Sequence, residues 1–572
     1  MFVIENLLRN EFFPSELPKC FNTNDLAKHA HDVISFANNF GRNFSIPLKY
    51  NGYKSETSRR KFSVPNPYHY CKAADLIVQN NSDLINIFEK SKYSLTAPTK
   101  KTAKETQSYS RRSVSVSDTK KEIEKLYQNN RYEIRLDINA FFENIYTHSI
   151  PWAIHGIAQA KQKQNDTSLL GNKLDKCMRA LNYNQTNGIL VGNAISRIIS
   201  EIILCTIDFQ IQDKFKDISC CRFVDDYYIY TKDSSQIQEI ISYIRSCLAQ
   251  YELNFNENKI QINESPFLYG KPWVEEIKQY IHLSPELFLS KLIMSYNHYK
   301  DLTIIKYGLK IIENCKYNKK TWPQMQSRLV NLWVRFPSLS DRLLPIFWNN
   351  KVHLQSRLLK QAIYAIADEA ILLNREQELI WATFASKVFG IIISQEYIVK
   401  ILKSKNDIAI IIALDIIYSK GIQNSNAIKS SLIELYDYLK SKDIDENNQP
   451  NTLLWTSHWL LAYEAEKNHW LNVDGRKFEF AIKNQFFQEL LKKDIAFYNP
   501  NYTYENIATK VFGPEYISRN ELYKLLDKLK QSISLRLNTD IQPDTNNLST
   551  EEEIMYETLM DSLGVDEIYN FE

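Results

Sequence analysis

The sequence feature that most constrains this chain is a pair of adjacent carboxylates between two apolar segments. Asp225 and Asp226 follow Phe223-Val224 and precede the aromatic run Tyr227-Tyr228-Ile229-Tyr230. Both flanks favour strands, so the sequence predicts two short strands that meet at a tight turn carrying both acids. Adjacent carboxylates repel each other and raise each other's pKa unless a cation neutralises them. A divalent metal such as Mg²⁺, which prefers oxygen ligands, is the simplest reason to hold two carboxylates there.

A third carboxylate lies upstream, at the expected end of another strand. Residues 132–136 alternate polar and apolar side chains up to Asp137, and residues 138–142 are largely apolar and aromatic. This pattern predicts a strand that ends at Asp137, followed by a turn or a short helix. Considered by itself, Asp137 is explained as well by a helix cap as by a metal ligand. An isolated Asp-Asp pair is more often a plain turn, although turns usually carry Gly, Pro or Asn rather than β-forming neighbours.

Together these segments resemble the palm of a reverse transcriptase. The Asp137 segment resembles motif A, and residues 223–226 resemble motif C, the Tyr/Phe-x-Asp-Asp box. Between them, residues 187–202 resemble motif B, in which a Gly-containing loop opens a long helix. Residues 253–260 resemble motif D, whose Lys lies near the triphosphate. The four boxes stand in the family's order, and the resemblance covers residues 15–285.

A narrower resemblance is carried by the segment directly after motif A. Residues 146–156, Tyr-Thr-His-Ser-Ile-Pro-Trp-Ala-Ile-His-Gly, look like the hallmark of the abortive-infection, AbiK-type reverse transcriptases, a group of phage-defence proteins. Residues 59–70, which open with Arg59-Arg60, are similar to the fingers segment of that group. Without the resemblance, the ordinary interpretations are a solvated loop and a solvated charge pair.

One departure from the common motif B bears on template use. The usual motif carries Pro-Gln before its Gly, whereas Leu190-Val191 precede Gly192 in this chain. The missing amide is a side chain that contacts the incoming nucleotide or the template. This departure argues against ordinary templated copying.

The resemblance implies a catalytic site with two metal ions. Asp137, Asp225 and Asp226 would be the catalytic residues and would hold two Mg²⁺ ions. The backbone carbonyl of Ile138 would add a further metal ligand. Two such ions activate the attacking oxygen and neutralise the leaving pyrophosphate in nucleotidyl transfer.

The resemblance also implies a set of nucleotide-binding residues. Phe142 would be the steric gate against the 2′ position of the sugar, so the substrates would be dNTPs. Lys259 and the Arg59-Arg60 pair would neutralise or protonate the pyrophosphate side. Gly192 would lie at the nucleotide on the motif B loop.

AbiK-type enzymes are known as a group for making DNA without an added template from a protein tyrosine. The resemblance therefore implies an antiphage enzyme, a homo-oligomer, whose DNA product stays covalently attached. The chain has 34 tyrosines, and the sequence does not choose the priming residue. Tyr109, Tyr556 and Tyr569 lie in segments that we expect to be mobile.

Two alternatives remain open at this point. The first is a defence reverse transcriptase that copies a dedicated noncoding RNA, which requires an RNA partner. The second is a palm whose catalysis is dispensable and which serves as a sensing scaffold. The retained charges of Asp137, Asp225, Asp226 and Lys259 argue against the second alternative, because a dead site is free to lose charges that disfavour burial.

The rest of the chain predicts a helical half. The 572 residues include only 13 glycines and 17 prolines, which favours helix. We expect an α+β fingers and palm followed by an all-α, HEAT-like helical-repeat domain in place of a thumb. The expected divisions are an N-terminal segment with fingers (1–130), the palm (131–285), the helical repeat (286–537) and an acidic, mobile tail (538–572). Helical spacing of apolar residues is clearest in six segments: Lys291–Tyr299, Thr303–Glu313, Gln355–Leu373, Glu376–Phe389, Asp407–Tyr418 and Ala427–Leu439.

Charge and cysteine usage bear on partners and location. The net charge of +3 is too small to indicate a partner, but residues 90–125 carry ten Lys or Arg against four acids and could hold nucleic-acid phosphates. The eight cysteines form no C-x-x-C pair, which favours a reducing compartment. The start of the chain lacks a signal-peptide pattern, and the apolar run near Ile408–Ile417 is too short to span a bilayer. We therefore expect a cytoplasmic protein that does not bind a membrane.

Overall fold

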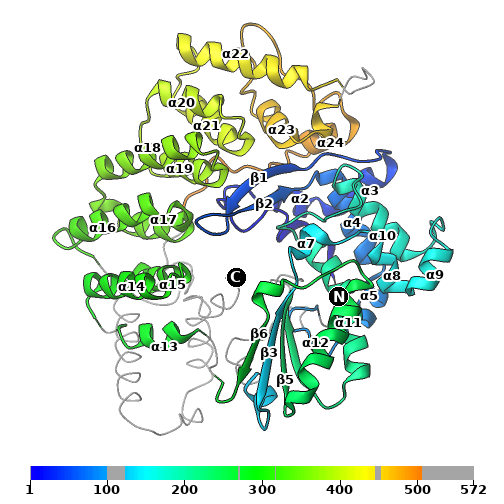
Figure 1. Ribbon diagram of the computed structural model, residues 1–572. Coiled ribbons are helices and arrows are strands. Elements are labelled where there is room, and N and C mark those ends of the chain that lie inside the picture. Colours follow the sequence, from blue (N-terminus) through cyan, green and yellow to red (C-terminus); the bar gives the residue numbers. More distant parts are fainter. Residues whose placement is uncertain are drawn as a thin grey trace, which may run out of the picture. The chain divides into compact units, whose positions relative to one another are not determined.

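The chain divides into two compact units (Figure 1). The first unit combines Met1–Tyr269 with Lys360–Tyr502, and the second combines Gly270–Leu359 with Thr503–Glu572. The computed structural model describes residues 2–98, 123–267, 271–281, 283–315, 317–444 and 452–504. The predicted tail (538–572), most of the basic stretch and the tyrosines 109, 556 and 569 lie outside the described residues.

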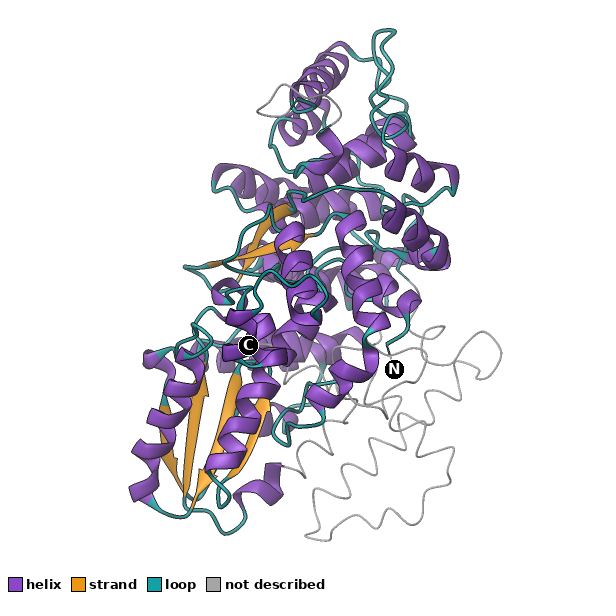
Figure 2. Cartoon of the chain, turned by 90° about the vertical axis from the view of Figure 1, so that its right-hand side faces the viewer, coloured by secondary structure: helices purple, strands orange, loops and turns teal. Residues whose placement is uncertain are grey.

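The first unit contains a four-stranded antiparallel sheet with strand order β4-β5-β3-β6. Strand β3 (Tyr132–Asp137) pairs with β5 (Asp226–Thr231) on one side and with β6 (Gln261–Glu264) on the other. Strand β4 (Ser219–Phe223) pairs with β5. Figure 2 shows this sheet with helices alongside it. This sheet is the predicted palm.

The predicted fingers contain a separate hairpin, with helices before and after it in the sequence. Strands β1 (Leu48–Tyr53) and β2 (Arg59–Val64) pair antiparallel. Helix α4 (Pro67–Gln79) follows directly, because Pro67 occupies its first turn and the Asn66 side chain accepts a hydrogen bond from Tyr68 N. The other helices before the basic stretch are α1 (Ile4–Arg9), α2 (Asn24–Lys28), α3 (Ala30–Asn39) and α5 (Asn81–Phe88).

Helices fill the chain between β3 and β4 and follow β5. Helix α11 (Ala194–Lys214) is the longest, and its first turn is capped by Asn193, whose side chain accepts from Ser196 N. Helix α10 packs against α8 and α4, and α11 packs against α8, α5 and α12. Their bounds are α7 (Phe141–Asn144), α8 (Ser149–His155), α9 (Ile157–Gln162), α10 (Leu170–Leu181) and α12 (Ile237–Ala249).

The later helices of the first unit pack in alternation. Helix α19 packs against α21, α20 against α22, and α21 against α23. Residues 408–417, the longest apolar run, lie inside α21 and are buried. No helix in the described ranges is long and apolar enough to cross a membrane. The bounds are α18 (Ser356–Leu372, which crosses the division between the units), α19 (Glu376–Val388), α20 (Gln395–Leu402), α21 (Asp407–Ser419), α22 (Asn426–Ser441), α23 (Trp459–Lys467) and α24 (Gln485–Lys492).

The second unit is helical throughout its described part. Helices α14 (Pro285–Tyr299) and α15 (Thr303–Glu313) approach each other closely at Gly308. There is no room for a side chain at this position, since an added Cβ would lie 2.0 Å from Leu292 Cδ1. The remaining helices are α13 (Pro272–Lys278), α16 (Trp322–Arg335) and α17 (Ser340–Asn349).

The six helices predicted from spacing are all present. Thr303–Glu313 coincides with α15, and four others differ from the prediction by one or two residues at an end. Helix α14 starts earlier than predicted, at Pro285, because Ser284 caps Leu287 N and Pro285 suits the first turn. The chain is thus an α+β region with a helix-rich remainder.

Candidate active site

The three predicted acids come to one end of the palm sheet. Asp137, the last residue of β3, is the register partner of Asp226, the first residue of β5. Asp225 precedes it, and its carbonyl accepts a hydrogen bond from Ile138 N at 3.3 Å. All three acids are half-buried. The β3–β5 ladder therefore brings the motif A acid beside both motif C acids.

The turn that carries Asp225 is strained. Phe223 pairs with Asp226, which leaves Val224 and Asp225 as the two central residues of the hairpin. Val224 has φ +51°, in the left-handed region that β-branched residues rarely occupy. Two-residue hairpins usually place Gly or Asn at such a position. Backbone strain of this kind concentrates at functional sites, and this turn follows that pattern.

The electrostatics of the turn favour a bound cation. The pKa of Asp225 is raised to about 6, chiefly by burial and also by the nearby charge of Asp137. The positive charges of Arg60 and Lys259 act in the opposite direction and lower the pKa of Asp225. A carboxyl that is hard to ionise beside another acid is stabilised in its charged form by a cation.

The chemistry of these donors fits a divalent metal, although the side chains are not yet gathered around one point. Carboxylate oxygens and the Ile138 carbonyl are ligands that hard cations prefer. Within the ranges that the structure describes, no three acidic, histidine or cysteine side chains converge as a preformed metal cage. The Lys259 ammonium lies 3.2 Å from Asp137 Oδ1 and balances that charge. Asp137, Asp225 and Asp226 are the residues that would hold a metal at this end of the sheet.

Backbone pairing to motif A explains why Lys259 reaches the acids. Asn256 N donates to Asp137 O at 2.8 Å, and Asn139 N donates to Asn254 O at 2.9 Å. The bridge between Ile138 and Phe255 lies between these two bonds. The motif D segment therefore runs against the end of β3.

The two arginines of the fingers hairpin have different surroundings. Adjacent side chains on a strand point to opposite faces. Arg60 acts electrostatically on Asp225. Arg59 instead forms a two-pronged ion pair with Glu378 of α19, with Nη1–Oε1 at 2.6 Å and Nη2–Oε2 at 2.5 Å. Arg60 therefore lies close enough to Asp225 to act on its charge, whereas Arg59 is paired with α19.

Two predicted nucleotide-binding residues lie at the motif B loop: Phe142 is hydrogen-bonded to it, and Gly192 is part of it. The Phe142 carbonyl accepts a hydrogen bond from Ile189 N at 2.9 Å, which joins α7 to the motif B loop. Gly192 has φ +101°, and a Cβ there would lie 2.7 Å from Pro14 Cγ. The N-terminal segment also accepts a bond from Ala194 N at Glu11 O. Nothing in the sequence marked this contact between residues 11–14 and motif B.

The hallmark segment lies at the start of the same loop. Thr147 N donates to Thr186 O at 2.8 Å, and Tyr146 bridges Asn187. His148 Nδ1 lies 3.0 Å from Asp175 Oδ2. The segment is therefore paired with the residues that lead into the motif B loop.

A group of polar residues that no sequence motif indicated lies behind the turn. Arg222 Nη1 donates to the Val224 carbonyl at 2.7 Å, and Val224 N donates to Thr96 Oγ1 at 3.3 Å. Arg222 is fully buried. A lone arginine inside a predicted apolar strand was the available signal, since buried charges need partners.

Comparison with known proteins identifies the domain. Residues 80–278 match the family model of the reverse transcriptase (RNA-dependent DNA polymerase). A comparison with curated proteins finds no match.

Among solved structures, the chain is similar to apo telomerase from Candida tropicalis. That match has 10% identity and a TM-score of 0.31, over 75% of this chain and 73% of that one. A form of the same telomerase truncated from the C-terminal domain matches at 12% identity and a TM-score of 0.28, over 40% of this chain. The match spans only 52% of that telomerase chain. The telomerase from Candida albicans in complex with a fragment of telomeric RNA matches at 10% identity, over 72% of this chain and 67% of that one, with a TM-score of 0.26.

The family match and the arrangement of the acids agree on the chemistry. The matched residues include β3, the α11 helix and the β4–β5 hairpin. Residues 80–278 therefore constitute a reverse-transcriptase domain, an enzyme module of the nucleotidyltransferase type.

Proposed function

We propose that this chain is an antiphage abortive-infection reverse transcriptase of the AbiK type. It polymerises dNTPs into DNA with Mg²⁺, without an added template, starting from a tyrosine hydroxyl of the protein. The observation that carries the proposal is the approach of three acids at one sheet end: Asp226 opposite Asp137, and Asp225 with its pKa raised to about 6.

The chain's own residues have separate tasks in this reaction. Asp137, Asp225 and Asp226 hold the metal ions, which activate the attacking hydroxyl and neutralise the leaving group when bound. Arg60 and Lys259 supply positive charge beside these acids, where the pyrophosphate leaves.

We assign the selection of dNTPs over rNTPs to Phe142 of helix α7. The Phe142 ring acts as the steric gate that excludes ribonucleotides. Its backbone is tied to motif B through the hydrogen bond from Ile189 N, so the ring is held beside the loop that receives the nucleotide. Phe142→Ala should raise the ratio of rNTP to dNTP incorporation, whereas an unchanged ratio would remove Phe142 from this role.

Template independence is supported by the motif B loop. The loop lacks Pro-Gln, and its Gly192 packs against Pro14 of the N-terminal segment. We assign the later helices the role of a HEAT-like domain that replaces a thumb. The functional form is a cytoplasmic homo-oligomer, which light scattering of the purified protein would test.

One experiment tests the activity. Nuclease-treated protein is given labelled dNTPs and Mg²⁺ alone, and the label that stays on the protein under denaturing conditions is measured. The wild type should carry covalent DNA, and Asp225→Asn should carry none. Asp217→Asn, an exposed acid in the same domain, is the matched control and should behave as the wild type. Equal labelling of Asp225→Asn would contradict the proposal.

The same material separates the two alternatives. A product of defined sequence together with a co-purifying RNA would favour RNA-templated synthesis. Full protection of cells against phage by Asp225→Asn would favour a sensing scaffold.

A further inference from the structure

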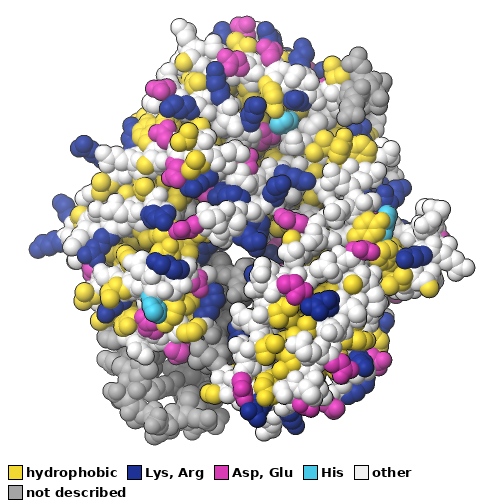
Figure 3. Space-filling view, in the orientation of Figure 1, with side chains coloured by type: hydrophobic (Ala, Val, Ile, Leu, Met, Phe, Trp, Pro, Cys, Tyr) yellow, Lys and Arg dark blue, Asp and Glu magenta, His cyan; other side chains and the backbone are white. Residues whose placement is uncertain are grey.

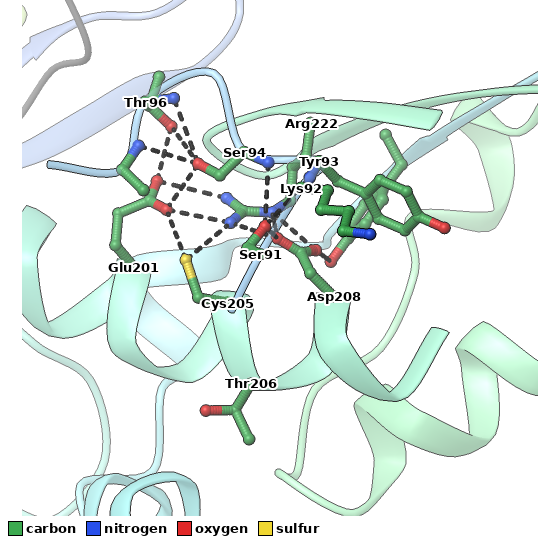
Figure 4. Close-up of polar contacts among 12 residues, drawn as sticks. Ser91, Lys92, Tyr93, Ser94, Thr96, Glu201, Cys205, Thr206, Asp208 and Arg222 are labelled. Atoms are coloured by element: carbon green, nitrogen blue, oxygen red, sulfur yellow. Dashed lines mark hydrogen bonds and ion pairs between the residues drawn. The ribbon is translucent and has the colours of Figure 1, made fainter. Parts of the chain in front are cut away.

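A cluster of charged side chains lies buried behind the Val224-Asp225 turn (Figure 4). Arg222 is fully buried, as is Asp208, and Glu201 is 3% exposed. Arg222 Nη2 lies 3.0 Å from Glu201 Oε2 and 2.8 Å from Asp208 Oδ2. Both acids belong to α11, the helix that the motif B loop opens. Buried charges persist when they are paired and hydrogen-bonded in this way.

The cluster holds both backbone polar groups of the strained residue. The Val224 carbonyl accepts from Arg222 Nη1 at 2.7 Å, and Val224 N donates to Thr96 Oγ1 at 3.3 Å. Thr96 Oγ1 in turn donates to Glu201 Oε1 at 2.6 Å. Glu201 therefore anchors the two groups that hold Val224 in its left-handed conformation.

The cluster also holds the strand on the other side of the acids. The Tyr227 hydroxyl donates to Asp208 Oδ1 at 2.7 Å, and Ser91 Oγ donates to Asp208 Oδ2 at 2.6 Å. Tyr227 directly follows Asp226. The acid pair is thus fixed from residue 224 on one side and from residue 227 on the other. Both attachments lead to α11.

A purely structural ion cluster would not need this arrangement. Replacing buried ion pairs with packed apolar residues is often neutral for stability. Holding a β-branched residue at positive φ is unfavourable, and such strain persists only when the surroundings impose it. The arrangement is understandable if the position of the two acids matters.

We propose that Glu201, Arg222 and Thr96 are positioning residues that set the Val224-Asp225 turn so that Asp225 and Asp226 bind metal together with Asp137. The inference rests on the proposed function for its chemistry. Its own test is metal binding, which can be measured without DNA synthesis.

The test uses a neutral change, because altering Arg222 or Glu201 risks misfolding. Thr96→Val removes the acceptor for Val224 N while it keeps the size of the side chain. Thr96→Ser restores the hydroxyl. Thr206→Val is the matched control. The Thr206 hydroxyl donates to Ile202 O within α11, and the Thr206 side chain points away from the cluster (Figure 4).

Mn²⁺ binding to the full chain is titrated by electron paramagnetic resonance, and the sites lost in Asp225→Asn define the binding of interest. Thr96→Val should weaken this Mn²⁺ binding about tenfold, as loss of groups that orient metal ligands does. Thr96→Ser should restore it, and Thr206→Val should bind as the wild type. In DNA synthesis, kcat should fall for Thr96→Val while KM for dNTP stays near the wild-type value.

Two outcomes overturn the inference. Mn²⁺ affinity of Thr96→Val equal to that of Thr206→Val would remove the positioning role, and so would a loss that Thr96→Ser does not restore. Failure of the proposed function looks different. The wild-type protein could bind Mn²⁺ through Asp225, with an affinity that depends on Thr96, and still form no DNA. That result would support the positioning role and contradict the proposed polymerase activity.

Discussion

Two β-hairpins bring charged residues to the same site, and they are held in opposite ways. The β4–β5 hairpin closes through two residues, and its turn is fixed by buried groups of α11 and of residues 91–97. The β1–β2 hairpin closes through residues 54–58, of which 54–57 are exposed, and is held along its edge. There, Asn51 N donates to Glu376 Oε2 at 2.6 Å and Tyr53 N to Gln377 Oε1 at 2.8 Å.

The β4–β5 hairpin is therefore anchored at its turn, and the β1–β2 hairpin is anchored along its edge. The acids of the β4–β5 hairpin stand on buried charge pairs, whereas Arg60 stands on a strand whose partners are side chains of α19. On the face drawn in Figure 3, basic and acidic side chains are interspersed over the described residues. A metal site needs fixed ligands, and a substrate contact tolerates movement.

The largest expected effect is a loss of stability from a change in the β4–β5 hairpin. Arg222→Met should lower the free energy of unfolding by about 3–5 kcal/mol, because it leaves Glu201 and Asp208 buried without a counter-charge. Urea denaturation of the purified variant measures this. A loss below about 1 kcal/mol would show that the β4–β5 hairpin does not depend on the cluster.

A smaller loss of stability is expected for a change in the β1–β2 hairpin. Arg59→Ala should lower the free energy of unfolding by about 2 kcal/mol, since Glu378 is only 4% exposed and loses a two-pronged partner. Arg60→Ala, one residue along, is the comparison. It should leave stability within about 0.5 kcal/mol of the wild type and reduce DNA synthesis. Reversed effects of the two variants would contradict the assignment of Arg59 to the helices and Arg60 to the acids.

The third prediction concerns pH. The folded pKa of Asp225, about 6, lies above the value of about 4 for an unfolded Asp. The stability from its proton is therefore fully present below about pH 4 and is lost as the pH rises through about 6. In metal-free protein at pH 8, Asp225→Asn should be more stable than the wild type by about 1–2 kcal/mol.

Thermal unfolding with a chelator, at pH 8 and at pH 4, checks this difference. The gap between wild type and variant should close at pH 4. A variant that is less stable than the wild type at pH 8 would contradict the burial of an unfavourable charge.

The smallest effect is expected at the strained residue itself. Val224→Gly removes the penalty of a β-branched residue at φ +51° and should raise the free energy of unfolding by about 0.5–1 kcal/mol. Differential scanning calorimetry resolves such a change. A clear loss of stability would mean that the Val224 side chain contributes more packing than its backbone loses in strain.

Local patterns predicted the elements of the site. Strand β3 ends at Asp137 and the acids lie at the β4–β5 turn, as alternation and β-forming flanks indicated. The opposite directions of Arg59 and Arg60 were also within reach of the sequence, since side chains on a strand alternate. The prediction that Arg59 and Arg60 both act on the pyrophosphate did not take this alternation into account.

Contacts between residues far apart in the chain could not be predicted from the sequence. Thr96 and Glu201 stand 105 residues apart, and no local pattern joins them. The packing of Pro14 on Gly192 likewise depends on the folded chain alone. The grouping of Lys360–Tyr502 with Met1–Tyr269 in one compact unit also depends on packing between distant parts of the chain.

The central claim is that Asp225 and Asp226, set by their hairpin opposite Asp137, bind the metal for nucleotidyl transfer. Its most direct test is the Mg²⁺ dependence of covalent DNA labelling from dNTPs by the wild type, Asp225→Asn and Asp217→Asn. Labelling should rise with Mg²⁺ in the wild type and in Asp217→Asn and should be absent from Asp225→Asn at every concentration. Labelling by Asp225→Asn at the wild-type level would contradict it.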